Sequence, residues 1–239
     1  MPTEATVAQV LASRYADHLP LYRQSQILVR QGIEIGREVL ADRTGTGALE
    51  IVPVVRRMRE ILLASPRLFA DETTMPVLDP GRGKTKKGYA WAIARDDRPW
   101  GGADPPAVVF HYAPDRGAEH AKDLLAGYRG VLQCDGYGVY KTLAAASEGI
   151  TLAFCWSHLR RQFIEFARGK TAPIAQETLQ RVAALYAIET EVRGKPPDIR
   201  RAVRQEGAAP SSRTCSPGSR HSSRGCPAAA RPRRRSATR

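Results

Sequence analysis

Residues 130–168 read GVLQCDGYGVYKTLAAASEGITLAFCWSHLRRQFIEFAR, and the expected fold class follows from this stretch. Two short apolar runs, 130–134 and 150–155, have the length and the bounding turn residues of buried strands. Each run is followed by a segment whose apolar residues have helical spacing, at 139–146 and 158–168. The order strand, helix, strand, helix predicts an α/β layer that contains parallel strands.

The residues before this stretch predict an antiparallel part of the same sheet. Alternating apolar residues indicate three strands, at 69–78, 89–95 and 107–112. Residues 81–88 (GRGKTKKG) predict a basic hairpin turn, and residues 119–128 predict a helix. Antiparallel strands followed by parallel additions fit a ribonuclease-H-like mixed sheet flanked by helices. A long helix at 175–193 completes this layer.

The first 68 residues predict a helical N-terminal segment. Six apolar residues form one stripe with helical spacing: Ile51, Val54, Val55, Met58, Ile61 and Leu62. Pro53 lies at the start of this stripe, and a proline fits a helix only near its first turn. We therefore expect a helix that begins shortly before Pro53.

The net charge of +13 is concentrated at the C-terminus. Residues 207–239 contain eight arginines and no acid, so the preceding 206 residues carry only +5. This tail, rich in Arg, Ser, Pro and Ala, has no apolar periodicity and is expected to be disordered. One interpretation is a nucleic-acid-binding arm. The other is an out-of-frame extension, because a GC-rich gene tends to encode these residues in a wrong frame.

Composition excludes several classes of protein. The sequence has no run of 18 apolar residues that would span a membrane, and its N-terminus has no secretory signal. Four cysteines form no evident disulfide framework, which favours a reducing, cytoplasmic setting. The segment 81–86 lacks the spacing of a phosphate-binding P-loop.

Two aspartates occupy positions that are unfavourable for a carboxylate without a partner. Asp71 lies within the apolar strand 69–78, and Asp135 directly follows the apolar run 130–134. On adjacent strands of one sheet, two such aspartates share hard divalent ions, Mg²⁺ or Mn²⁺. Two ions about 3.5–4 Å apart serve phosphodiester chemistry. Taken alone, however, an Asp-Gly pair after a strand is most often a turn.

Other polar residues have a structural and a functional interpretation. Cys155 and His158 have a ligand-like spacing, but no second pair lies nearby, so no zinc site is expected. His111 and His120 have no evident partners in the sequence. Five basic residues are candidates for DNA contact, although a solvated face is the simpler interpretation: Lys84, Lys86, Lys87, Arg160 and Arg161.

Several blocks in order resemble the bacterial transposases of the Insertion Sequence 66 family. These blocks are residues 15–24 (YADHLPLYRQ), 70–73 (ADET), 77–80 (VLDP), 91–99 (WAIARDDRP), 132–137 (LQCDGY), 155–163 (CWSHLRRQF) and 185–191 (LYAIETE). The resemblance covers about residues 13–206. We expect the upstream DNA-binding and zinc-binding regions of full-length members to lie outside this sequence, and the arginine tail follows where the family is expected to continue in helical sequence.

The resemblance implies a DNA transposase with an Asp-Asp-Glu triad and two magnesium ions, which cleaves and joins DNA at transposon ends and target. Asp71 and Asp135 match the two aspartates, and Cys155 and His158 match a supporting Cys-x-x-His block. Glu72 is a poor third ligand, because in a strand it points away from Asp71. If the family glutamate follows a helical insertion, it lies beyond this chain, and Glu189 or Glu191 is the only substitute within it.

The expected organisation is a helical segment (1–68), an incomplete catalytic core (69–206) and the tail (207–239). The leading hypothesis is a truncated, defective transposase of the bacterial nucleoid with DNA as partner. A second is a non-catalytic DNA-binding fragment that pairs with itself or with an intact transposase. A third is an unrelated nuclease or phosphotransferase with the same core. None of the three involves a membrane.

Overall fold

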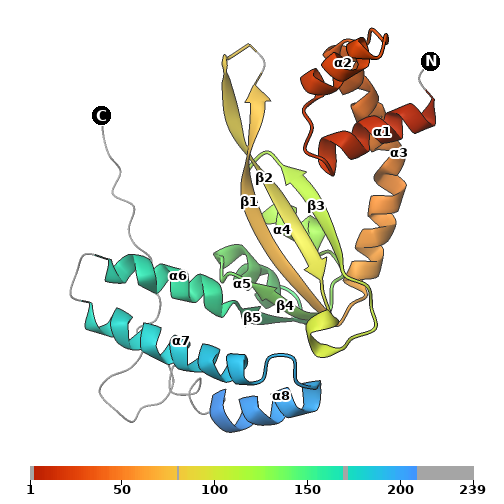
Figure 1. Cartoon of the computed structure of the whole chain (residues 1–239). Helices are drawn as coiled ribbons and strands as arrows, with labels where there is room; N and C mark the ends of the chain where they lie inside the picture. Colours follow the sequence, from red (N-terminus) through yellow and green to blue (C-terminus); the bar gives the residue numbers. More distant parts are fainter. Residues whose placement is uncertain (1–2, 80, 169–171, 209–239) are drawn as a thin grey trace, which may run out of the picture. The chain divides into compact units, whose positions relative to one another are not determined.

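The computed structural model describes residues 3–79, 81–168 and 172–208 (Figure 1). The chain forms two compact units, Met1–Ala64 and Ser65–Arg239. The arginine tail expected to be disordered lies outside the described residues, apart from its first two positions. No helix in the described ranges is both long and apolar enough to cross a membrane.

The first unit consists of three helices, which confirms the expected helical segment. They are α1 (Glu4–Tyr15), α2 (Leu21–Arg30) and α3 (Arg37–Leu63). The Thr3 hydroxyl caps α1 by accepting a hydrogen bond from the amide of Thr6 at 3.3 Å. Helices α1 and α3 approach closely at Gly47, where an added Cβ would lie 2.8 Å from a Val7 methyl. A side chain at position 47 would therefore push the two helices apart.

Pro53 does not mark the start of a helix, so that expectation was wrong. It lies inside α3, which begins at Arg37, sixteen residues earlier. Proline removes the hydrogen bond to the carbonyl four residues before it, here that of Leu49. Leu49 is 72% exposed, so water can solvate that carbonyl. Of the predicted apolar stripe, Leu62 is fully buried, whereas Ile51, Val54, Val55 and Ile61 are exposed.

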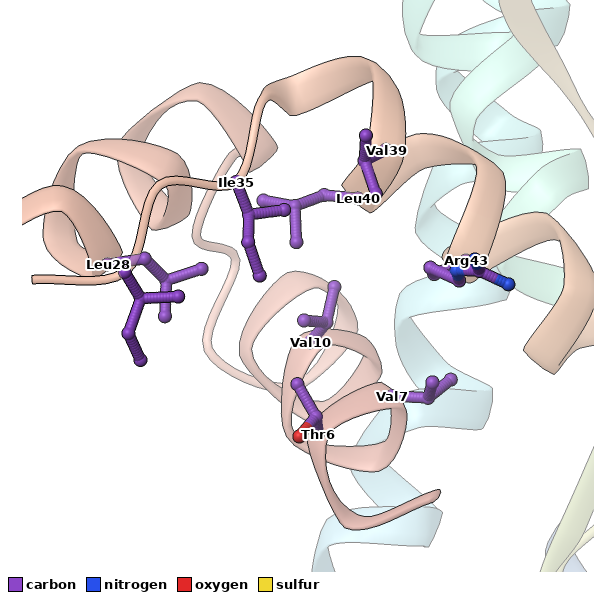
Figure 2. Close-up of a pocket in the computed structure, with 9 residues that line it drawn as sticks. Thr6, Val7, Val10, Leu28, Ile35, Val39, Leu40 and Arg43 are labelled. Atoms are coloured by element: carbon purple, nitrogen blue, oxygen red, sulfur yellow. The ribbon is translucent and has the colours of Figure 1, made fainter. Parts of the chain in front are cut away.

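A hollow of about 330 Å³ lies between α1, α2 and the first turns of α3 (Figure 2). Its walls are mainly aliphatic. They comprise Thr6, Val7, Val10, Leu28, Ile33, Ile35, Val39, Leu40 and Arg43. The Nε atom of Arg43 is buried here without a hydrogen-bond partner in the described part of the chain.

The second unit contains a five-stranded sheet. Its strands are β1 (Arg67–Asp79), β2 (Lys84–Arg95), β3 (Ala107–Ala113), β4 (Gly130–Cys134) and β5 (Ile150–Phe154). Their spatial order is β3-β2-β1-β4-β5, with β1, β2 and β3 antiparallel and β1, β4 and β5 parallel. The sheet confirms the predicted mixed α/β class with its ribonuclease-H-like strand arrangement.

In the described part of the second unit, five helices and two short helical segments accompany the sheet (Figure 1). They are α4 (Ala118–Leu124), α5 (Gly138–Ala145), α6 (Trp156–Ala167), α7 (Pro173–Glu191) and α8 (Pro197–Val203), with η1 (Arg98–Trp100) and η2 (Arg204–Ala208). Helices α6 and α7 run antiparallel. The Ser157 hydroxyl at the start of α6 lies 2.8 Å from the Tyr186 hydroxyl near the end of α7.

One face of the sheet forms the core. Leu68, Ala70 and Leu132 are buried on this face, and Trp91 of β2 packs edge-on against Tyr140 of α5, with ring centroids 6.3 Å apart. Trp91 also lies beside His120 of α4. Helices α4 and α5 therefore cover the face of the sheet to which the even-numbered residues at the start of β1 point.

The basic turn expected at 81–88 is shorter than predicted. Strand β2 begins at Lys84, so Lys86 and Lys87 belong to a two-stranded ribbon in which Lys86 pairs with Val77. The turn itself uses Gly81 and Gly83, whose φ angles of 85° and 62° suit glycine. The backbone pairing of β1 with β2 extends through the lysines because their exposed side chains do not interfere with it.

Candidate functional site

Asp71 lies in the middle of β1, opposite Ala92 of β2. Its side chain is exposed, on the sheet face opposite to the buried Ala70. Its Oδ1 atom accepts a hydrogen bond from the amide of Glu72 at 3.0 Å. The Oδ2 atom accepts none from the described residues, which leaves it available to a ligand.

Asp135 directly follows β4. Its Oδ1 atom accepts a hydrogen bond from the amide of Tyr137 at 2.8 Å, which closes a tight turn through Gly136. Gly136 has a φ of 85°, a conformation that favours glycine. The hydrogen bond thus restrains the Asp135 carboxylate directly after the carboxyl end of β4, a strand inside the sheet.

The register of the sheet relates the two aspartates. Strands β1 and β4 pair in parallel from Arg67 and Val131 to Phe69 and Gln133. The paired ladder ends two residues before Asp71 and Asp135, and β4 itself ends at Cys134. Besides burial, the charge of Asp135 contributes to the raised pKa of Glu72 and of Tyr140. Carboxylate oxygens are hard ligands of the kind that suits Mg²⁺ or Mn²⁺.

Glu72 faces away from Asp71, as expected from strand alternation, and its side chain is only 1% exposed. It accepts hydrogen bonds from Arg116, with the Arg116 Nε atom at 2.7 Å, and from the Tyr140 hydroxyl at 2.9 Å. Burial raises the pKa of the Glu72 carboxyl, although these two partners oppose the rise. Burial and the charge of Glu72 raise the pKa of Tyr140, so its hydroxyl stays a donor at neutral pH.

Sequence reasoning assigned no role to Arg116, which lies 44 positions after Glu72 in the loop before α4. Its guanidinium stacks over the ring of Tyr137, 3.7 Å from the centroid, and the Tyr137 hydroxyl donates to the Arg116 carbonyl at 3.1 Å. The only sequence signal for this arrangement was the direction of Glu72. Nothing local pointed to the arginine that would meet it.

Glu189, the candidate third acid, lies on α7. Both of its carboxylate oxygens accept hydrogen bonds from Arg204, at 2.6 Å each. This pairing lowers the pKa of the Glu189 carboxyl. Glu191, the other candidate, is exposed at the end of the same helix. The structure therefore gives Glu189 a firm ion-pair partner within its own helical layer.

The remaining predicted residues lie on other elements, although the Cys155 amide donates a hydrogen bond at 2.9 Å to the carbonyl of Cys134, the residue before Asp135. Lys84, Lys86 and Lys87 are exposed on the β1–β2 ribbon, and Arg160 and Arg161 are exposed on α6. Cys155 precedes α6 and, like Cys134, carries a free thiol. The Nδ1 atom of His158 is buried and has no partner within the described ranges.

A second group of ligand-type side chains surrounds the start of α4. The ligand atoms of Asp115, Glu119 and His120 lie within 4.8 Å of one another. His120 Nε2 lies 2.9 Å from Asp115 Oδ1, so His120 has a partner that the sequence did not reveal. Asp115 and Glu119 are largely exposed, at 64% and 66% of their side chains. Exposed acidic groups of this kind occur commonly without a metal.

Comparison with known proteins identifies a family to which this chain is similar. A family model described as "Transposase IS66 family" matches residues 1–230. The uncharacterized protein y4qI of Sinorhizobium fredii is 42% identical over 212 residues, covering 86% of this chain and 39% of that protein. The uncharacterized protein y4jD of the same organism is 42% identical over 215 residues, covering 88% of this chain and 42% of that protein.

The chain spans about two fifths of the length of these curated relatives. The family match runs on to residue 230, well past the position near 206 where the resemblance noted in the sequence ends. Family similarity is therefore not restricted to the helical and sheet units, and it reaches into the arginine-rich segment.

Proposed function

Because the chain belongs to the IS66 family of transposases, we propose that it acts on DNA during transposition, with Asp71 and Asp135 as ligands of divalent cations. The observation that carries this proposal is the parallel pairing of β1, which contains Asp71, with β4, which ends directly before Asp135. Their family-like sequence blocks and their positions in a ribonuclease-H-like sheet support the same function.

The two aspartates have the donor chemistry for Mg²⁺ or Mn²⁺, since both offer hard carboxylate oxygens. When bound, a pair of such ions activates an attacking oxygen and stabilises a leaving oxygen in phosphodiester exchange. The protein chain contributes by holding the two aspartates in place. Asp71 is fixed by the ladder between β1 and β2, and Asp135 by its hydrogen bond to the Tyr137 amide. Both ligands are therefore held before any substrate arrives.

We assign this chain weak or no strand cleavage by itself. Glu189 is the candidate third acid within the chain, and Arg204 binds both of its oxygens. A glutamate engaged in such a pair must break two charge-assisted hydrogen bonds before it can bind a cation. Binding of metal and DNA without cleavage is the behaviour that this arrangement supports.

A DNA-binding titration tests the proposal. A labelled duplex that carries the ends of the element is titrated with the full chain in Mn²⁺ and in EDTA, and binding is followed by fluorescence anisotropy. We expect Mn²⁺ to strengthen binding, and we expect Asp135→Asn to remove that gain. Asp79→Asn, on the same strand as Asp71, serves as the control and should keep it. Equal binding in Mn²⁺ and EDTA would contradict the proposal.

Strand cleavage of the same duplex tests the assignment of weak activity. We expect cleavage in Mn²⁺ to stay at the level of the Asp135→Asn variant. Cleavage that clearly exceeds this level would confirm the metal site while showing that the chain contains a complete set of catalytic groups.

A second candidate function is a DNA-binding fragment that modulates an intact transposase. The exposed lysines of the ribbon (Lys84, Lys86 and Lys87) and the exposed Arg160 and Arg161 favour it. Binding to DNA phosphates gives an affinity that falls steeply with salt. If the three lysines bind phosphates, changing them to Gln should flatten the salt slope by about one unit for each phosphate that is no longer bound. Deletion of 207–239 measures the contribution of the tail in the same way.

A further inference from the structure

An ion pair between a buried carboxylate, Glu72, and a partly exposed arginine, Arg116, lies beside one of the candidate metal ligands. Glu72 follows Asp71 in β1 and points to the covered face of the sheet, where its side chain is 1% exposed. Each of its oxygens has a partner, Arg116 on one and Tyr140 on the other. A buried carboxylate without such partners would be strongly unfavourable. The arrangement at Glu72 is therefore specific, and it joins β1 to two other segments.

The same arginine also holds the segment that carries Asp135. The Arg116 guanidinium stacks on the ring of Tyr137 at 3.7 Å, and the Arg116 carbonyl accepts a hydrogen bond from the Tyr137 hydroxyl at 3.1 Å. The Tyr137 amide in turn donates to Asp135 at 2.8 Å. A continuous chain of contacts thus runs from Glu72 through Arg116 and Tyr137 to Asp135.

The ladder between β1 and β4 ends two residues before the aspartates, at Phe69 and Gln133. Backbone pairing alone therefore does not reach Asp135. The contacts through Arg116 connect β1 with the Asp135 turn beyond that point. Hydrogen bonds to metal ligands commonly fix the orientation of those ligands, and the Tyr137 amide makes such a bond to Asp135.

We propose that Glu72, Arg116, Tyr137 and Tyr140 form a latch that holds the Asp135 turn against β1 and so presets the spacing of Asp71 and Asp135. The proposal rests on the assignment of these aspartates as metal ligands. Glu72 and Arg116 are positioning residues in this account. They touch neither the cation nor DNA, and they act through the residues that carry the aspartates.

Hydrogen exchange tests the latch without any metal. Peptides that contain the Tyr137 amide are followed by mass spectrometry in the wild-type chain and in Glu72→Gln and Arg116→Met. We expect exchange in the 135–140 segment to become about tenfold faster in both variants, because each variant removes the charge-assisted hydrogen bonds that restrain the turn. Asp104→Asn, which removes an exposed partner of Arg95, should leave this segment unchanged.

Unchanged exchange at 135–140 in both variants would overturn the latch. Glu72→Gln preserves the shape of the side chain, and Arg116 is 40% exposed, so the second variant keeps the test informative if the first fails to fold.

Mn²⁺ affinity then separates positioning from a merely structural role. By calorimetry well below the melting temperature, Glu72→Gln should bind Mn²⁺ about tenfold more weakly with unchanged stoichiometry. A lower melting temperature with wild-type Mn²⁺ affinity would overturn the positioning role. If the wild-type chain itself binds no Mn²⁺, the proposed function fails, and hydrogen exchange alone decides whether the latch holds the Asp135 turn.

Discussion

Phe69 of β1 lies directly opposite Gln133 of β4, as the last pair of a short parallel ladder. Two residues beyond each of them stand Asp71 and Asp135. Asp71 is within β1, whereas Asp135 follows the last residue of β4 and lies in a turn closed by the Tyr137 amide. The proposal that the two carboxylates bind a divalent cation together rests on the neighbouring positions of β1 and β4.

Removal of either carboxylate should weaken metal binding. Asp71→Asn and Asp135→Asn each replace a charged ligand by a neutral amide, and we expect Mn²⁺ affinity to fall at least tenfold, that is by about 1.4 kcal/mol or more. Isothermal titration calorimetry measures this directly. Asp79→Asn, at the far end of the same strand, should retain wild-type affinity. Equal losses of Mn²⁺ affinity in all three variants would show that the effect comes from the change in net charge and not from a specific metal site.

We expect the turn at Gly136 to be required for Mn²⁺ binding. Gly136 and Gly127 have φ angles of 85° and 79°, so alanine at either position costs about 1–2 kcal/mol of stability. A Cβ at Gly136 would meet only ordinary contacts with Phe154, so backbone strain is the main cost. We expect both Gly→Ala variants to lose similar stability in urea unfolding. Only Gly136→Ala should also weaken Mn²⁺ binding. An equal loss of Mn²⁺ affinity in Gly127→Ala would show that the effect does not come from the Gly136 turn.

The core beneath the site depends on β4. Leu132 is fully buried, and it pairs with Leu68 of β1 in the parallel ladder. Leu132→Ala should therefore lower the free energy of unfolding by about 2–5 kcal/mol, because it removes buried methyl groups and leaves a cavity. Leu78→Ala, at a position that is 80% exposed, should change stability by less than about 0.5 kcal/mol. Similar effects of the two changes in urea unfolding would contradict the placement of β4.

Acid should weaken the helical layer through Glu189. The Arg204 guanidinium lowers the pKa of the folded-state carboxyl below its ordinary value of 4.5. The pair therefore contributes its full stability above that ordinary value, and this contribution is lost as the pH falls through the lowered pKa. Glu189→Gln should flatten the loss of stability between neutral and acidic pH. Arg204→Met should flatten it to the same extent, and a double variant should add nothing further in pH-dependent thermal unfolding.

Much of the fold was accessible from the sequence because its elements are locally encoded. The apolar runs at 130–134 and 107–112 match β4 and β3 closely, because short apolar segments between turn residues have few alternatives. The position of Asp135 after its strand followed for the same reason. The outward direction of Asp71 and the inward direction of Glu72 followed from strand alternation.

Features that depend on distant residues were not predictable in this way. Nothing near Arg116 indicates that it meets Glu72, 44 positions earlier in the chain. The same limitation applies to His120 and its partner Asp115 across the loop before α4. Pro53 gave a wrong helix start because the penalty for an internal proline falls where the unpaired carbonyl can be solvated. Local patterns thus located the helices and strands, whereas the pairing of polar groups depended on contacts between residues that are distant in the sequence.

Anomalous X-ray scattering from crystals of the full chain grown with Mn²⁺ tests the central claim most directly. We predict an anomalous peak between Asp71 and Asp135, about 2.0–2.2 Å from a carboxylate oxygen of each. A peak confined to the Asp115, Glu119 and His120 group would contradict the claim. So would carboxylates of Asp71 and Asp135 held more than about 10 Å apart, since two-metal chemistry needs far closer ligands.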